Sequence, residues 1–379
     1  MTGRAWPEVY KKLGVAPIIN AQSWVTALGG SIMRSEVLRA MDEAANAFID
    51  IKKLNRAAGE VVALSCGAEM GLVTGGCSAA QVLMVAACMT GLSEENAEQL
   101  PDTTGMKNEV ILFKGQRNRY DKAFVTAGAT LVEYGEVGSV TAQDLDDAIN
   151  ENTACVAYVV APFGAEGIGL EETARVAHTR GVPVIVDAAA EVPPRANLTK
   201  FHEQGADMVA FSGGKGIGGP QSSGLLAGKK ELMEAVWLNS LNLESPIAAI
   251  GRPMKVSKEN IVGLVTALQL FTDSDETAEW DGWVSKAKYV AERLSGIKGI
   301  RVTLEGSEEK RQGPQPILYF EDDYDGPSIA EIKEQLENGD PGIYVGGGRR
   351  NEIAIVMVNV QDGEEIEIAD RMDEILRNG

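Results

Sequence analysis

Seven short apolar runs bounded by turn residues recur through the first two-thirds of the chain, and this pattern restricts the fold more than any other feature. The runs are residues 71–76, 109–113, 130–135, 153–162, 182–190, 207–214 and 223–228. Amphipathic stretches separate most of them, including 78–92, 141–152 and 170–181. Short buried strands that alternate with helices build a mainly parallel sheet between helix layers. The sequence therefore predicts an α/β fold.

The pattern of expected helices and strands changes after about residue 245. Two long helical runs, 258–276 and 282–297, precede the strand-like segments IRVTLEG, PILYFE and EIAIVMVNV. This order is typical of a smaller α+β domain. We expect a large domain over 51–248, a small C-terminal domain over 249–379, and an N-terminal segment, 1–50, that packs on the other domains.

Composition narrows the class of function. The formal net charge of the 379-residue chain is −20, which disfavours nonspecific binding to nucleic acids. No stretch approaches the roughly 20 apolar residues of a membrane helix, and the start, MTGRAWPEVYKK, lacks a signal-peptide core. Four cysteines without CxxC spacing and two histidines predict no metal site. We therefore expect a cytoplasmic protein without a metal.

Asp187 ends an apolar run in VPVIVDAAAEVPP. A carboxylate at the end of a buried strand needs a partner, because burying an unpaired charge is costly. In open α/β sheets, ligands bind beyond the carboxyl ends of the strands. A ligand-binding aspartate is one interpretation, and a helix cap or turn former is the other.

Lys215 lies 28 residues later in FSGGKGIGGPQSSG, where five nearby glycines are expected to let the backbone approach a ligand closely. A phosphate loop of the NTPase type requires GxxxxGK followed by Ser or Thr, but Ala210 replaces the first glycine and Gly216 follows the lysine. The S-x-x-K motif of penicillin-binding enzymes requires a KTG partner, which the chain lacks. The remaining chemistry is a lysine that forms a Schiff base with pyridoxal phosphate (PLP).

Such a site has three parts: a buried anion for the pyridine nitrogen, the covalent lysine, and backbone amides for the phosphate. Asp187 and Lys215 supply the first two. In GLVTGGCSAAQVLMVAA, a glycine turn leads into a helix start, where free N–H groups and the helix dipole attract phosphate. Taken alone, this segment also fits an ordinary strand-to-helix turn.

These three parts, in this order, resemble fold type I PLP enzymes. Within that fold, the chain resembles the group that contains L-seryl-tRNA(Sec) selenium transferase and D-glucosaminate-6-phosphate ammonia-lyase. The resemblance runs from GVAPIINAQ to about residue 245 and is densest in the pattern S-G-x-K-x-x-x-G-P-Q, found here as SGGKGIGGPQ. It implies the PLP-dependent transferase-like fold, with PLP as the cofactor.

The resemblance also implies roles for individual residues. Lys215 is the Schiff-base lysine and Asp187 the partner of the pyridine nitrogen. The other cofactor-binding positions are Gly75, Gly76, Cys77, Ser78 and Ser212 at the phosphate, Gln116 near the ring face, and Gln221 on a loop close to the partner subunit of a homodimer.

Three arginines are expected to bind substrate. Arg117 follows Gln116, where relatives often carry a histidine; a glutamine cannot titrate. Arg349 and Arg350, in VGGGRRNEIAIV, are expected to grip a substrate carboxylate by planar two-point contacts. An exposed hairpin with solvated arginines explains this segment equally well.

The preferred reaction is α,β-elimination by a lyase that acts on a hydroxylated or sugar-derived amino acid. Racemisation and aldol cleavage stay open, because the same lysine and aspartate serve all three reactions. Selenium transfer to seryl-tRNA is less favoured, since the chain is acidic and the resemblance begins at Gly14, without the transferases' N-terminal tRNA-binding domain. We expect a small amino-acid substrate.

Overall fold

The chain divides into two compact units, which are described separately. The computed structural model describes residues 7–160, 164–165, 167–241, 245–306, 313–348 and 350–378. Unit 2 comprises residues 33–274, and unit 1 joins the described residues up to Ile32 with those from Asp275 onward. None of the helices in the described ranges has the length and apolar composition of a membrane span.

The units end at positions that differ from the domain boundaries expected from sequence. Helix α11 (Lys258–Asp273) belongs to unit 2, because it packs against α2 (Ser35–Ala45) and α3 (Ile51–Cys66). The N-terminal segment is divided, since β1 (Ile18–Ala21) pairs with β11 (Gly342–Gly347) of unit 1. Long-range packing of this kind leaves no mark on local composition.

Unit 2 is built on a seven-stranded sheet whose order is β2-β8-β7-β6-β5-β3-β4. Only β8 runs antiparallel to its neighbours, β2 and β7. The strands are β2 (Met70–Thr74), β3 (Glu109–Phe113), β4 (Thr130–Tyr134), β5 (Thr153–Val159), β6 (Val184–Asp187), β7 (Met208–Ser212) and β8 (Gly224–Gly228). Six of these strands lie within the apolar runs, and β2 begins one residue before its run, so the expected mainly parallel α/β sheet is confirmed.

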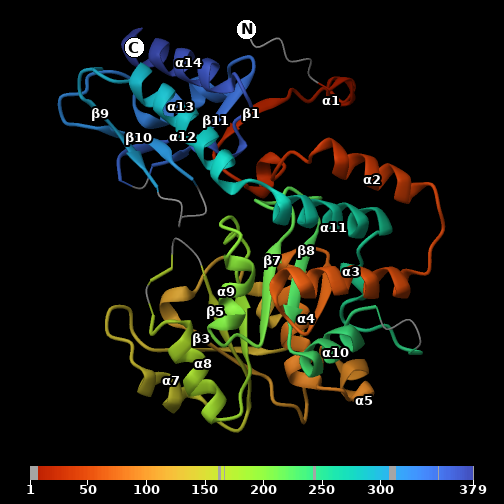
Figure 1. Ribbon diagram of the computed structural model, residues 1–379. Coiled ribbons are helices and arrows are strands. Elements are labelled where there is room, and N and C mark those ends of the chain that lie inside the picture. The colour runs from red at the N-terminus through yellow and green to blue at the C-terminus, as the bar shows by residue number, and fades with distance from the viewer. Residues whose placement is uncertain are drawn as a thin grey trace. The chain divides into compact units, whose positions relative to one another are not determined.

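Helices cover both faces of this sheet (Figure 1). One face packs on α4 (Cys77–Thr90) and α10 (Lys230–Asn239), and the opposite face packs on α3, α8 and α9. The unit also contains four short helices: α5 (Glu94–Gln99), α6 (Lys122–Val125), α7 (Ala142–Ala148) and α9 (Asn197–Glu203). Helix α8 spans Leu170–Thr179. Because both faces are covered, the central strands β5, β6, β7 and β8 are buried at nearly every position rather than alternating, whereas the edge strand β4 carries the exposed Thr130 and Glu133.

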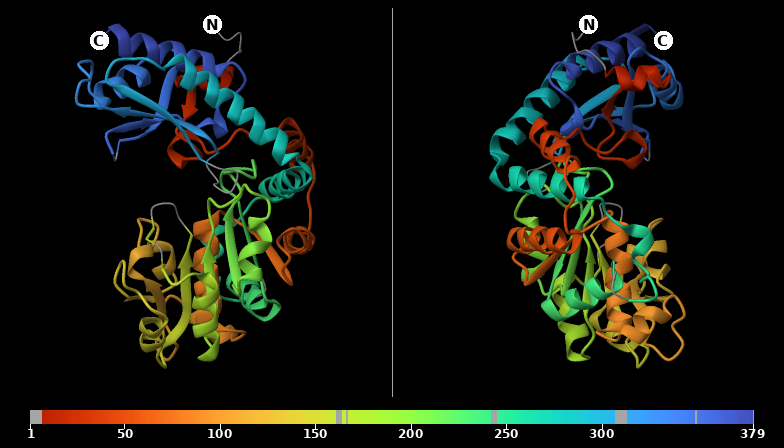
Figure 2. Two further views of the ribbon diagram at one scale, coloured as in Figure 1. Left: turned by 60° about the vertical axis from the view of Figure 1, so that its left-hand side comes forward. Right: turned by 90° about the vertical axis from the view of Figure 1, so that its right-hand side faces the viewer.

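Unit 1 is a five-stranded sheet of order β1-β11-β12-β10-β9 with its own apolar core (Figure 2). Its remaining strands are β9 (Ile300–Glu305), β10 (Gln315–Phe320) and β12 (Glu352–Ala354), and its helices are α1 (Glu8–Lys12), α12 (Glu276–Arg293), α13 (Ile329–Glu337) and α14 (Glu364–Asn378). This is the α+β arrangement expected for the C-terminal part. The run EIAIVMVNV forms only a three-residue strand, followed by a 3₁₀ turn at Met357–Asn359.

Candidate active site

The carboxyl edge of the unit 2 sheet gathers most of the residues singled out in the sequence. Strands β2, β6 and β7 run in the same direction, so their last residues, Thr74, Asp187 and Ser212, lie along one edge. The glycine turn before α4 follows β2, and Lys215 follows β7. This is the edge at which open α/β sheets bind ligands.

Asp187 is a buried carboxylate held by three donors. Its side chain is 7% exposed. Oδ1 accepts from Cys77 Sγ at 3.3 Å and from the Ala189 backbone N at 3.0 Å, and Oδ2 accepts from Gln81 Nε2. Burial raises the pKa of Asp187, while the Ala189 N–H, Cys77, the charge of Lys215 and Gln81 act to lower it. The donors therefore favour the anionic form that burial opposes.

Cys77 begins helix α4 and stays protonated. Burial, followed by the negative charge of Asp187, raises the pKa of this thiol well above its ordinary value. A protonated thiol is a donor, which matches its contact with Asp187 Oδ1. Cys77 thus links the helix start to the buried carboxylate.

The charge of Lys215 acts on the same two side chains. It lowers the pKa of both Asp187 and Cys77, in opposition to burial. Such an effect requires proximity in a poorly solvated region. The structure therefore brings Lys215, Asp187 and Cys77 together, although 28 residues separate the lysine from the aspartate in sequence.

The start of helix α4 is suited to bind an anion. No side chain caps the helix at Gly76, and α4 runs for 14 residues, so its first N–H groups and its dipole are not neutralised by a capping residue. Gly76 has a φ of +123°, and no atom lies within 4 Å of the place where a Cβ would stand. Open space and uncapped amides at this point fit a phosphate group.

Most of the five glycines around Lys215 are packed tightly against other segments of the protein. A Cβ at Gly213 would meet Ser223, one at Gly214 would meet Gln221, and one at Gly216 would meet Val192, each at less than 3.0 Å. The protein's own atoms fill the space beside these glycines. The loop folds tightly against neighbouring segments at these three positions, whereas the Cβ position of Gly218 lies in open space. Close approach of a ligand to this loop stays a prediction.

These residues fit pyridoxal phosphate. Asp187 offers a buried anion for the ring nitrogen, Lys215 offers an amine whose charge acts on that carboxylate, and the start of α4 offers uncapped amides for the phosphate. Ser212 ends β7, half-buried, with its backbone N bonded to the Ala189 carbonyl at 3.2 Å. Ser78 is the second residue of α4. The roles of the individual residues stay predictions, which the variants below test.

Gln116 is buried beside the end of β5. Its Oε1 accepts from the backbone N of Val159 at 3.0 Å, and the side chain is 5% exposed. This bond fixes the carboxamide at the same sheet edge as Asp187. A position near the cofactor ring stays a prediction for Gln116.

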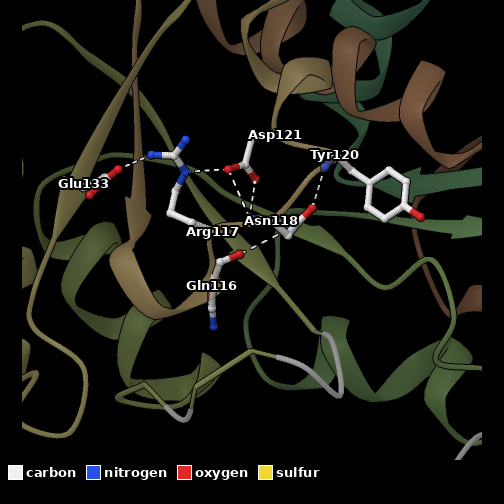
Figure 3. A network of polar contacts seen from close by, with 6 residues as sticks. All are labelled: Gln116, Arg117, Asn118, Tyr120, Asp121 and Glu133. Carbon is white, nitrogen blue, oxygen red and sulfur yellow. Dashed lines mark hydrogen bonds and ion pairs between the residues drawn. The ribbon is translucent and has the colours of Figure 1, made fainter. Parts of the chain in front are cut away.

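Arg117 is engaged by two carboxylates (Figure 3). Its Nε lies 2.5 Å from Asp121, and Nη1 binds Glu133 on β4. Asp121 also accepts from the backbone N of Asn118. These contacts favour a role in shaping the loop after β3 over the predicted substrate contact, for which Arg117 would have to exchange partners.

The remaining predicted residues lie farther along the chain. Gln221 is exposed on the loop before β8. Arg350 is exposed in unit 1, and its backbone N donates to Glu352. Arg349 lies outside the described residues. A substrate-binding role for Arg349 and Arg350 therefore stays a prediction.

Gln81 was not singled out in the sequence, although it contacts Asp187 directly. A signal for it exists in CSAAQVLMVAACMT, where one long polar side chain interrupts an otherwise apolar or small-residue helix. Cys77 and Gln81 stand four residues apart and so share one face of the helix. The sequence signal for Gln81 is therefore this pair of side chains on one helix face, directly after a glycine turn.

A cavity of about 340 Å³ is lined in part by Thr74, the last residue of β2. Its lining includes three cationic side chains, Lys52, Arg56 and Lys255, and two glutamates, Glu94 and Glu234. Neither Lys215 nor Asp187 lines it. The two glutamates offset two of the three cations, so the lining is not strongly basic and gives little reason to place a substrate phosphate there.

Replacing Gly76 by alanine is expected to weaken both the fold and cofactor binding. The backbone at Gly76 lies in a region that residues with a Cβ rarely adopt, so the strain costs about 1–3 kcal/mol. We expect a lower free energy of unfolding in denaturant and a larger dissociation constant for PLP. Gly282, inside α12 with open space around it and an ordinary φ, is the matched control, and Gly282→Ala is expected to stabilise slightly. Unchanged stability and affinity in Gly76→Ala would contradict this assignment.

Comparison with known proteins identifies the family. The family model for L-seryl-tRNA selenium transferase matches residues 19–280. A 5'-C-glycyluridine monooxygenase-decarboxylase from Streptomyces sp is 31% identical, over 97% of this chain and 92% of that protein. A D-glucosaminate-6-phosphate ammonia lyase from Salmonella typhimurium is 32% identical, over 89% of both chains.

A solved structure of D-glucosaminate-6-phosphate ammonia-lyase covers 99% of both chains with a TM-score of 0.86 at 31% identity. The matched residues include the sheet edge that carries Asp187, Lys215 and the glycine turn. The chain therefore belongs to the L-seryl-tRNA selenium transferase family and is a pyridoxal-phosphate-dependent enzyme with the fold type I architecture.

Proposed function

We propose that this enzyme is a lyase that releases ammonia from a hydroxylated or sugar-derived amino acid. The observation that carries the proposal is the similarity to D-glucosaminate-6-phosphate ammonia-lyase along nearly the whole chain, together with the cluster of Lys215, Asp187 and the α4 start at one sheet edge. D-glucosaminate 6-phosphate is the first substrate to test.

In this reaction, some residues bind the cofactor and another transfers a proton. When bound, pyridoxal phosphate supplies an electron-withdrawing ring that takes up negative charge from the substrate's α-carbon. Asp187 would keep the ring nitrogen protonated, and the α4 amides would hold the phosphate. The amine of Lys215 would act as the base that removes the α-proton of the substrate. Loss of the β-hydroxyl as water then leaves an enamine, whose hydrolysis gives a 2-oxo acid and ammonia.

Other reactions begin with the same residues. A racemase would return the proton to the opposite face of the α-carbon, and an aldolase would break the bond between the α- and β-carbons. The monooxygenase-decarboxylase among the relatives indicates that sequences this similar carry out different reactions. A tRNA substrate is disfavoured by the net charge of −20.

The assembly and location follow from the same assignment. We infer a homodimer or higher homo-oligomer in which the Gln221 loop lies near the partner's site, and a cytoplasmic location. A strictly monomeric species in sedimentation would contradict this placement of Gln221.

A substrate panel tests the proposed reaction. The purified, PLP-loaded protein is incubated with D-glucosaminate 6-phosphate, with unphosphorylated D-glucosaminate, and with D- and L-hydroxy amino acids. We expect release of ammonia and a 2-oxo acid from at least one of them, and no release by Lys215→Ala under the same conditions. Aldehyde formation or loss of optical activity without ammonia would identify an aldolase or a racemase and overturn the lyase assignment.

A further inference from the structure

Gln81 is a buried polar residue in the second turn of helix α4. Its side chain is 2% exposed, and nearly every other residue of the helix is apolar or small and buried. A polar side chain in such a place costs stability unless it is hydrogen-bonded. The contacts of Gln81 therefore explain why the helix carries it.

The carboxamide of Gln81 is directed at Asp187. Nε2 donates to Oδ2, whereas Oδ1 is already taken by Cys77 and the Ala189 backbone N–H. Each carboxylate oxygen accepts about two hydrogen bonds. Among the described residues, Oδ2 therefore accepts a single bond and retains one acceptor site.

The other end of the carboxamide shows that this contact is not optimal for folding. Gln81 Oε1 is buried and has no hydrogen-bond partner among the described residues. An unsatisfied buried acceptor destabilises a fold. Turning the amide over would place Oε1 against the carboxylate of Asp187, so the orientation is fixed by Asp187. A hydrocarbon side chain of similar length would suit this apolar helix at least as well.

We propose that Gln81 is a positioning residue that acts through Asp187: it holds Oδ2 in place and keeps the carboxylate ionised, so that the cofactor's ring nitrogen stays protonated. The proposal rests on the assignment of Asp187 as the partner of that nitrogen. The direction of the pKa effect agrees with it. Burial raises the pKa of Asp187, and the bond from Gln81 is one of the contacts that lower it.

The variant Gln81→Met tests the proposal, because methionine has nearly the length of glutamine and no donor. The primary measurement is the ¹⁵N chemical shift of the ring nitrogen in protein loaded with ¹⁵N-labelled PLP. We expect this resonance to move toward that of an unprotonated pyridine. We also expect kcat to fall by about 10- to 100-fold with little change in KM, because a bond to a charged group is lost. Thermal stability of the cofactor-free variant should stay near that of the unmodified protein.

Controls separate positioning from packing. Met84→Leu changes a buried apolar side chain on the same helix that has no group able to donate a hydrogen bond to Asp187, and it should leave the ¹⁵N shift unchanged. In an Asp187→Asn background, where the nitrogen is already unprotonated, adding Gln81→Met should have no further effect on the shift or on kcat. An unchanged shift in Gln81→Met alone, or an equal further loss of kcat in the double variant, would overturn the proposal.

The readout also distinguishes this proposal from the assignment of the reaction. The ¹⁵N shift is measured without substrate, so it stands whether or not ammonia is released from any compound in the panel. If Asp187→Asn leaves the nitrogen protonated, Asp187 is not the partner of the ring nitrogen. The proposed positioning role of Gln81 is then wrong as well.

Discussion

Replacement of Lys215 by alanine is expected to remove covalent cofactor attachment and to lower turnover by about 10⁴-fold or more, because one side chain acts both as the attachment point and as the base. The unmodified, PLP-loaded protein should absorb visible light, and borohydride should fix the cofactor to Lys215. Peptide mass spectrometry locates the adduct. The Lys215→Ala protein should lose both the absorbance band and the adduct.

Lys230 offers a matched control for this experiment. It lies at the start of α10, its side chain is 70% exposed, and among the described residues this side chain makes one long ion pair of 4.0 Å, with Glu234. Lys230→Ala should keep absorbance, adduct and turnover. A borohydride adduct on any lysine other than Lys215 would refute the central assignment of the site.

Asp187→Asn is expected to produce the second-largest loss. Asparagine keeps the shape of the side chain but removes the charge that stabilises the protonated ring nitrogen. We therefore expect turnover to fall by about 10²- to 10³-fold, which is the range for loss of one preorganised electrostatic group. Affinity for PLP should fall as well. Equilibrium dialysis and steady-state rates measure the two effects, and a variant with normal turnover would rule out the assigned role.

Asp187→Asn is expected to raise the stability of the cofactor-free protein at neutral pH, although it lowers turnover and PLP affinity. Burial raises the pKa of Asp187 in the folded state above its value of 3.8 in the unfolded chain. The folded state therefore binds the proton more tightly, so this residue's contribution to stability is lost as pH rises through the folded-state pKa. Asparagine stays neutral, so cofactor-free Asp187→Asn should be more stable than the unmodified protein at neutral pH, with the difference shrinking toward pH 4. Denaturation curves at several pH values test this sign.

The large sheet was accessible from sequence because both of its faces are covered. A strand buried on two sides is apolar at every position, and the turn residues on either side mark its ends. Each of the seven strands of unit 2 therefore coincides with an expected run, to within one residue at the start of β2. The run EIAIVMVNV looked equally strand-like, but Met357–Asn359 turn inward as a 3₁₀ segment, and composition does not distinguish these states.

The candidate site was only partly accessible from sequence. Asp187 and Lys215 carry local signals, since Asp187 ends a strand and Lys215 follows one. The tight packing of Gly213, Gly214 and Gly216 could not be predicted, because the atoms beside them come from Ser223, Gln221 and Val192, and those contacts depend on tertiary structure. Gln81 escaped notice because its meaning depends on a carboxylate 106 residues away.

In the tightly folded loop around Lys215, adjacent residues are under two different evolutionary constraints. At Gly213, Gly214 and Gly216, any side chain collides with the protein itself, so mutation there is penalised in every cell that must fold the chain, whatever it metabolises. Lys215 stands among them under a separate constraint, imposed only where the chemistry is needed. A lineage that no longer required the reaction would be free to lose the lysine while keeping the glycines, and the glycine pattern without its lysine would then mark a descendant that has retained the fold and abandoned the catalysis.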